Sequence, residues 1–277
     1  MPSWQKNKKL QTMDNELRQK GFSLTEVLLA VGTLAIGMLF IAGTFLAGVH
    51  FTTIATERTI AAVAADEAFA KIKLYGVNPN DPNLLVGSLR PFETVDLIDI
   101  SPYEYGYPST PTSPLDKQYY WSALCRRVAP DPNRLVQVTV FVSRKVSSAA
   151  RYWKRDTNKW PVLLQLPYPS PVDVNVVHDP LVHNQYELSI IDLNPPPADT
   201  VDEATFINDG YTIVENTTGD KYRVLERVEG QPGIFNRILL DRPWLGGPAG
   251  SVWVVPPSIT GSRGPCITVY QTEIRFQ

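Results

Sequence analysis

The feature that most constrains this chain is a long uncharged stretch near its N-terminus. From Val27 to Thr56 no residue is charged when His50 is neutral, and the central run VLLAVGTLAIGMLFIAGTFLAGV is apolar apart from two threonines. Roughly 20 apolar residues are enough to cross the hydrocarbon core of a bilayer as a helix. A helix that is apolar on every side is uncommon within a globular domain of this size. The stretch therefore predicts a membrane-spanning helix.

Charge is distributed unevenly around this stretch. Residues 1–21 carry five Lys or Arg residues against two acidic ones, a net charge of +3, so the remainder must carry −5 to give the formal charge of −2 for the chain. The positive-inside rule then predicts a cytoplasmic N-terminus and an extracytoplasmic body. The pI of about 6.0 gives no general reason to expect nucleic-acid binding.

A secretory signal peptide also begins with basic residues and continues as an apolar run, so it is the alternative to a retained span. The apolar stretch here is longer than a typical signal-peptide core. The string AGTFLAG offers only a weak cleavage site, and no cysteine follows it in a position to carry a lipid. These features favour a span that the mature protein keeps.

Glu26 lies directly before the uncharged stretch. A lone carboxylate at the edge of an apolar helix is costly in hydrocarbon and usually has a partner. The side chain could reach the lipid headgroups, in which case it needs no special role. Alternatively, it pairs with a cation at the same depth, such as a free N-terminal amine created by cleavage just upstream.

The string KGFSLTE at residues 20–26, followed by the apolar run, closely resembles the type IV prepilin motif of pilins and pseudopilins. This resemblance implies that prepilin peptidase cleaves after Gly21 on the cytoplasmic face and that the new terminal residue, Phe22, is N-methylated. It also implies that Glu26 pairs with the terminal amine of a neighbouring subunit. The resemblance is close over about residues 16–75 and holds for the rest only in outline.

The same resemblance implies a structural subunit rather than an enzyme, without a cofactor. Its implied partners are prepilin peptidase, other pilin or pseudopilin subunits, the inner-membrane assembly platform and the lipid bilayer, with no nucleic acid required. The protein would cross the inner membrane once, with its body in the periplasm, and would join a filament after assembly. The resemblance leaves a type IV pilus, a competence system and a type II secretion pseudopilus open, and within the family it favours a minor member of the I or PilV type.

The helix is expected to continue beyond the membrane. Apolar residues recur at helical spacing, and charged residues occupy the other faces, up to a stop at Tyr75-Gly76. All but one of the 24 prolines lie at or beyond Pro79, so none interrupts this segment. We therefore predict a leader over 1–21 and a transmembrane and assembly helix over 22–74, which gives the lollipop architecture that the resemblance also implies.

The remaining sequence alternates strands and turns, and predicts an α+β fold with an antiparallel β-rich domain over 75–191. A hairpin is expected from two alternating runs, Tyr119–Val128 and Leu135–Val142. Residues 145–185 are rich in proline and are expected to be mostly loops. A proline-rich connector begins at residue 192, and a C-terminal β subdomain over 192–277 follows. One short strand is expected just before the connector, at 186–191. The expected strands of the subdomain are 211–214, 222–228, 238–240, 252–255 and 267–276.

Two cysteines fall in predicted strands. Cys125 lies in the first strand of the expected hairpin, and Cys266 begins the last strand. An oxidising periplasm permits a disulfide between them. Two buried free thiols are the alternative, and the sequence does not separate the two.

Motifs for catalysis or metal binding are absent: the sequence contains no P-loop, HExxH, GxSxG or CxxC. The spacing of His50, His178 and His183 suits no helical metal pair. Two groups of charged residues are most simply interpreted as solvated surface. The acidic group could offer oxygen ligands to Ca²⁺ and consists of Asp192, Asp199, Asp202, Glu203 and Asp209. The basic group could meet an anion or DNA and consists of Arg126, Arg127, Arg144 and Lys145.

Two other classes of function stay open. One is a membrane-tethered module that binds DNA, a surface or a secreted substrate. The other is a tethered hydrolase whose site the sequence spacing does not reveal.

Overall fold

The computed structural model describes residues 22–82, 84, 88–109, 117–128, 134–155, 163–192, 201–228, 236–261 and 264–276. The chain divides into two units, Met1–Thr56 and Glu57–Gln277, and each is described by itself. The expected leader, including Gly21, lies outside the described residues.

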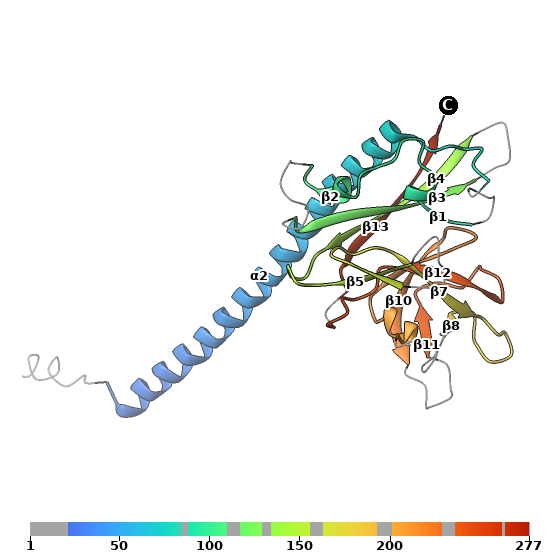
Figure 1. Cartoon of the computed structure of the whole chain (residues 1–277). Helices are drawn as coiled ribbons and strands as arrows, with labels where there is room; N and C mark the ends of the chain where they lie inside the picture. The colour runs from blue at the N-terminus through green and yellow to red at the C-terminus, as the bar shows by residue number, and fades with distance from the viewer. Residues whose placement is uncertain are drawn as a thin grey trace, which may run out of the picture. The chain divides into compact units, whose positions relative to one another are not determined.

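The helix α2 (Leu24–Tyr75) is 52 residues long and is apolar over its first part (Figure 1). Among the described residues it is the one helix long and apolar enough to cross a membrane, and its most apolar window contains no buried residue. The helix ends where the sequence predicts. Gly76 adopts a left-handed φ of 77°, and its N–H donates to the C=O of Ile72 at 3.0 Å, as is usual for a glycine that terminates a helix.

In the second unit, the C-terminal part of α2 packs on a five-stranded antiparallel sheet with the order β1-β3-β4-β13, in which β2 also pairs with β3 (Figure 1). The predicted hairpin is confirmed as β3 and β4, which pair continuously from Tyr119↔Arg144 to Arg127↔Val136. The strands are β1 (Arg90–Pro91), β2 (Gly106–Tyr107), β3 (Tyr119–Arg127), β4 (Leu135–Arg144) and β13 (Cys266–Arg275).

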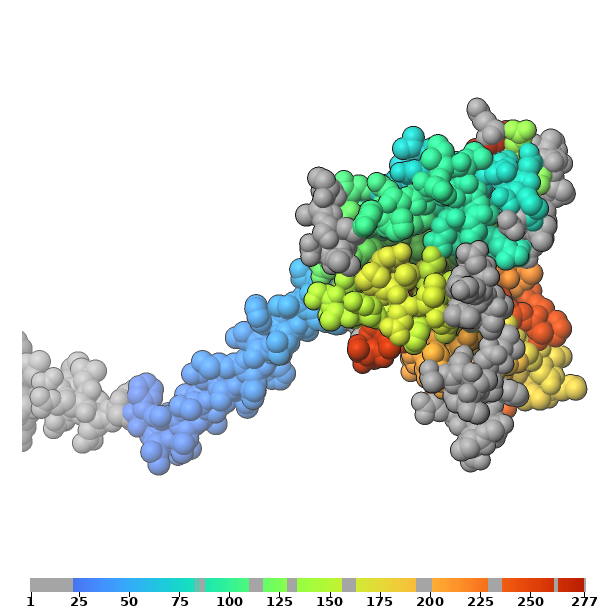
Figure 2. Space-filling view, in the orientation of Figure 1, coloured from blue at the N-terminus to red at the C-terminus, as the bar shows by residue number. Residues whose placement is uncertain are grey.

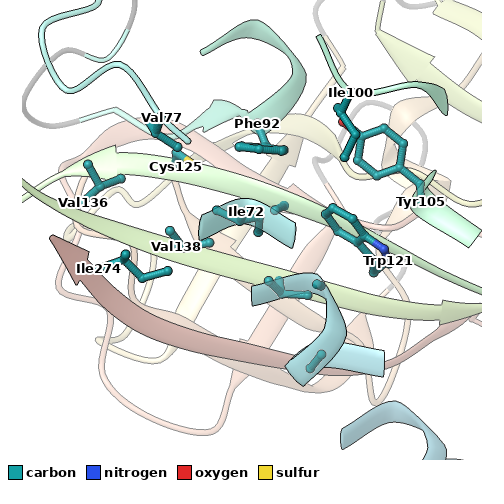
Figure 3. Packing of buried hydrophobic residues seen from close by; sticks show 14 of the residues in the cluster. Ile72, Val77, Phe92, Ile100, Tyr105, Trp121, Cys125, Val136, Val138 and Ile274 are labelled. Carbon is teal, nitrogen blue, oxygen red and sulfur yellow. The ribbon is translucent and has the colours of Figure 1, made fainter. Parts of the chain in front are cut away.

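Small residues on α2 allow the helix to approach the sheet closely. Four alanines and Ile72 form its buried face, and they meet alternate valines of β4, since side chains two apart on a strand share a face. Figure 3 shows Ile72 among Cys125 and Val138 of the sheet, with Trp121 beside them. These helix and β4 residues are Ala61, Ala64, Ala65, Ala68 and Ile72, and Val136, Val138, Val140 and Val142.

A closed barrel of six strands, in the order β10-β11-β8-β7-β12-β9, forms the other part of the second unit. Its interior is apolar: Val172, Val174 and Val176 of β7 alternate inward and are buried with residues of all five other strands. The strands are β7 (Val172–Val177), β8 (Glu187–Ile191), β9 (Thr212–Glu215), β10 (Lys221–Val228), β11 (Arg237–Leu240) and β12 (Ala249–Val254).

The barrel packs on the face of the five-stranded sheet that is opposite α2. Leu124 and Phe141 of the sheet are fully buried there against Val214 and Trp253 of the barrel. Among the described residues, a two-stranded sheet, β5 (Tyr152–Arg155) with β6 (Leu163–Leu166), and three short 3₁₀ helices also belong to this unit. These helices are η1 (Phe92–Thr94), η2 (Pro102–Tyr105) and η4 (Glu203–Phe206).

The strand content agrees with an α+β fold. The predicted boundary between a domain over 75–191 and a subdomain over 192–277 differs from the structure. The barrel takes β7 and β8 from before that point, whereas β13 returns to pair with β4. The strands β5, β6 and β7 lie in the segment that was expected to be mostly loops. The reason is physical: strand partners are chosen by which faces can be buried together, and proximity in the sequence does not decide it.

Candidate assembly segment

The start of α2 forms a reciprocal cap. The backbone N–H of Glu26 donates to the Ser23 hydroxyl at 3.2 Å, and the N–H of Ser23 donates to Glu26 Oε2 at 2.9 Å. This is a capping box, the arrangement in which Ser at the cap and Glu three residues later satisfy one another's backbone N–H groups. The pattern Ser-x-x-Glu before an apolar run could have predicted it. Glu26 therefore has a local structural role, in addition to the pairing that the prepilin motif implies.

The first unit presents an apolar surface. Phe22 is 85% exposed and Leu39 is 74% exposed, and every large apolar side chain from Phe22 to Phe51 is exposed. Contiguous apolar surface of this length is costly in water, and such surfaces meet lipid or other proteins. The residues include Leu28, Leu29, Leu34, Ile36, Phe40, Ile41, Phe45 and Leu46.

The hydroxyl groups of five threonines in this segment form hydrogen bonds within the helix and need no partner from the surroundings. The hydroxyls of Thr33 and Thr44 each donate to the carbonyl four residues earlier at 3.0 Å, and Thr52, Thr53 and Thr56 bond in the same way. Polar groups that are satisfied within the helix can enter a lipid environment at low cost. The carboxylate of Glu26 is the exception, because a charge is expensive there even when it caps a helix.

The cysteines are both free, so of the two alternatives that the sequence leaves open the structure has two free thiols and no Cys125–Cys266 disulfide. Cys125 pairs with Val138 and Cys266 with Ser143, on opposite sides of β4. At about 4.8 Å per strand and 3.4 Å per residue the two Cα atoms are on the order of 20 Å apart, which is far beyond the reach of a disulfide.

The two thiols also lie on different faces of the sheet. Cys125 belongs to the core beneath α2, and Cys266 packs with the core beside the barrel. Burial raises the pKa of the Cys266 thiol to about 12, and burial likewise raises that of Cys125. Both thiols are therefore poor nucleophiles and behave as small apolar core residues.

The histidines do not form a metal site. His50 lies in α2, whereas the rings of His178 and His183 stack with centroids 6.1 Å apart in the loop between β7 and β8. His183 is used for structure: its Nδ1 accepts from the N–H of Asp179 at 2.9 Å, and its Nε2 lies 2.8 Å from the Ser189 hydroxyl. Among the described residues no group of three His, Cys, Asp or Glu side chains could hold a metal ion.

Three of the acidic residues that could offer ligands to Ca²⁺ have separate structural partners. Asp202 caps η4 by accepting from the N–H of Ala204 at 3.0 Å, and Asp209 accepts from the N–H of Arg227 at 2.6 Å. Glu203 is buried in an ion pair with Arg155 at 2.6 Å. Asp199 lies outside the described residues. The described members therefore do not form one cation site.

Two of the basic residues that were weighed for anion binding also have partners in the fold. Arg126 donates to Gln137 Oε1 at 3.0 Å and to the C=O of Thr217 at 2.6 Å. Arg144 forms an ion pair with Glu57 of α2. These contacts tie β3 and β4 to neighbouring segments, and an anion or DNA would have to compete with them.

Comparison of the chain with known proteins gives no relative: no family model, no curated protein and no solved structure matches it. Its function must therefore be inferred from its own residues and geometry.

Proposed function

We propose that the chain is a minor pilin or pseudopilin, a structural subunit of a type IV pilin-like filament. It is inserted in the inner membrane with its body in the periplasm, cleaved by prepilin peptidase between Gly21 and Phe22, and assembled with similar subunits through the N-terminal part of α2. In this role it carries out no catalysis of its own.

One observation carries the proposal. The segment that follows the prepilin-like string is a continuous helix whose large apolar side chains are exposed on all sides from Phe22 to Phe51. A helix of this kind needs a lipid or protein environment, and a subunit that moves from membrane to filament has both in turn. The single carboxylate near its start is suited to setting the register between subunits, because an unpaired charge would be left in an apolar environment.

Mass spectrometry of the N-terminus of the mature protein tests the proposal directly. We expect a chain that begins at Phe22, with a mass increase of one methyl group on that residue. A protein that retains residues 1–21, or one cut within or after the apolar run, would contradict it. Co-purification with other pilin-like subunits is the second expected result.

Two substitutions at Glu26 separate its two roles. Glu26→Ala removes both the cap and the charge, and we expect normal membrane insertion and processing with impaired assembly. Glu26→Gln keeps an oxygen that can accept from the Ser23 N–H but removes the charge. If register depends on the charge, Gln impairs filament incorporation as strongly as Ala does. Normal incorporation of the Ala variant would refute the assembly role.

A further inference from the structure

The loop between β7 and β8 is folded around the ring of His183. Over residues 179–183 the chain makes a single turn, in which the N–H groups of Val182 and His183 both donate to the C=O of Asp179, at 3.0 and 2.7 Å. The His183 ring closes this turn, because its Nδ1 accepts from the N–H of Asp179 at 2.9 Å. Its Nε2 lies 2.8 Å from the Ser189 hydroxyl of β8. The ring therefore ties the turn to the barrel.

This contact lies on the outer face of the barrel and is shielded from water. Leu188 and Ile190 are buried in the barrel interior, so Ser189 between them points outward, since successive side chains on a strand face opposite sides. Ser189 pairs with Arg237 of β11, which places that residue on the neighbouring strand. His183 is 8% exposed and Ser189 is 4% exposed. A charge on the ring would consequently be poorly solvated there.

Separate backbone hydrogen bonds hold the two ends of the loop. The N–H of His178 donates to the C=O of Pro248 at 2.8 Å, and the N–H of Trp244 donates to the C=O of Gln185 at 2.7 Å. Figure 2 shows the yellow atoms that follow β7 at the surface, beside the orange-red atoms of the segment before β12. Residues 179–183 can therefore change conformation locally while the barrel strands stay paired.

The two histidines of the loop differ in what an added proton does to their contacts. Nδ1 of His178 lies 2.9 Å from the C=O of Glu187, so it donates a hydrogen bond and remains a donor when the ring is charged. Nδ1 of His183 accepts from the N–H of Asp179, so a proton there places two N–H groups against each other. Acid therefore breaks the contact of His183 and leaves that of His178 intact.

Charged and titratable groups from two strands and from the loop itself face the His183 ring. Burial is the largest cause that lowers the pKa of His183, and Arg237 of β11 and the stacked His178 ring act in the same direction. Glu187 of β8 and Asp179 of the loop raise it. A released loop, with an ordinary histidine pKa of about 6.5, binds the proton more readily than the closed loop. Closure is therefore favoured above that pH and is lost as the pH falls below it.

We propose that His183 is a pH-dependent switch, whose protonation releases residues 179–183 from the barrel while the strands around them stay folded. The released turn carries an apolar tip, because Leu181 is 94% exposed and Val182 is 54% exposed. The surface that this end of the barrel presents would then change with the acidity of its compartment. The contacts all belong to the second unit, so the switch operates whether or not the chain assembles into a filament.

Hydrogen exchange of the full-length chain in detergent, followed by mass spectrometry at pH 7.5 and pH 5, tests the proposal. Labelling times are scaled to the intrinsic exchange rate at each pH, so that protection reports local opening. In peptides that cover 179–183 we expect protection to fall about fivefold or more at pH 5, whereas peptides of β10 keep theirs. Unchanged protection over 179–183, or an equal loss in β10, would overturn the proposal.

An asparagine tests whether the proton on His183 is the trigger. His183→Asn offers an oxygen that can accept from the N–H of Asp179 and does not titrate, so the acid-dependent loss over 179–183 should disappear. His50→Asn makes the same change in α2 and should keep the full loss. An undiminished loss in His183→Asn would contradict the switch. Protection that is absent at both pH values would show that the turn depends on the ring, as the proposal requires.

A second variant tests the proton without altering the ring of His183. His178→Gln keeps a donor for the C=O of Glu187 and removes a group that can carry positive charge. The pH at which half of the protection over 179–183 is lost should therefore rise, because less positive charge opposes protonation of His183. A midpoint that stays in place or falls would contradict the switch.

Discussion

At the scale of single residues, His183 makes the loop between β7 and β8 sensitive to pH. The residue is 8% exposed, and its Nδ1 can accept from the Asp179 N–H only while that nitrogen carries no proton. Its Nε2 then donates to the Ser189 hydroxyl. This fixes the neutral tautomer, and protonation of Nδ1 would break the contact that holds the start of the loop.

Stability is therefore expected to fall in mild acid. Burial, with Arg237 and His178 nearby, lowers the pKa of His183, while Glu187 and Asp179 act in the opposite direction. The unfolded chain, with a histidine pKa of about 6.5, then binds this proton more readily than the folded one, so the free energy of unfolding falls as pH drops below that value. The difference in melting temperature between pH 7.5 and pH 5 should be smaller in His183→Gln. An unchanged difference would contradict this role.

The two thiols give a second prediction at this scale. Protein purified without reductant and then unfolded should react with two equivalents of iodoacetamide per chain, because both cysteines are free. In the folded protein Cys125 should not react, since it is fully buried and its pKa is raised by burial. Detection of a peptide that links Cys125 to Cys266 would contradict the structure.

At the scale of elements, the end of α2 depends on Gly76. Its φ of 77° is unfavourable for residues with a Cβ, and an added Cβ would lie 2.9 Å from Leu97 Cδ1. Gly76→Ala should lower the free energy of unfolding by about 1–2 kcal/mol from backbone strain, plus a contribution from crowding. Gly210→Ala is the matched control, because Gly210 has a φ of 79° with nothing near the added Cβ. If thermal unfolding shows the same loss of stability in the two variants, crowding contributes nothing at Gly76.

Elements with strong local signals could be predicted from the sequence. The end of α2 follows from Tyr75-Gly76, and the β3–β4 hairpin follows from its alternating apolar residues. The strand β7 was missed, although Val172, Val174 and Val176 alternate, because the prolines around it favoured a loop. Those prolines lie before and after β7 and leave its ladder with β12 intact. Proline limits where a strand begins and ends, and it does not exclude a strand between two prolines.

At the scale of the whole second unit, a buried ion cluster links three elements. Arg155 of β5 donates to the carboxylate and C=O of Asp173 of β7, at 3.2 and 3.1 Å, and lies 2.6 Å from Glu203 of η4. Burial raises the pKa of both carboxyl groups, and the guanidinium of Arg155 opposes this effect. The Arg155 side chain therefore compensates two carboxyl groups that are costly to bury.

Removing this cation alone should destabilise the protein more than replacing all three charged groups of the cluster. Arg155→Met should lower the free energy of unfolding by about 3–5 kcal/mol, because two buried carboxyl groups lose their partner. Adding Asp173→Asn and Glu203→Gln should recover much of the loss. Tryptophan fluorescence during guanidinium unfolding measures all three proteins. A triple variant less stable than Arg155→Met would contradict this explanation.

The candidate sites differ in how far the sequence could predict them. The segment around Phe22 and Glu26 is contiguous, so a local motif was enough to single it out. A cavity of about 610 Å³ in the second unit takes its lining from β1, β3, β5, β7 and β12, and no spacing in the sequence brings Ala123, Lys154 and Trp253 together. The pairing of β13 with β4 could not be predicted from the sequence either, because it depends on which faces can be buried together in the folded chain.

The position of β13 in the sheet also determines the order in which this body can be completed. The whole barrel, from Val172 to Val254, is inserted between β4 and β13 in the chain. During synthesis the barrel strands are available before Cys266–Arg275 has been made, so the barrel can close while β4 still has an open edge. An exposed edge with alternating valines is a site for pairing with another chain. Until residues 266–275 have been made, α2 has only part of its sheet to pack on, and a premature stop before residue 266 would leave β4 without this partner.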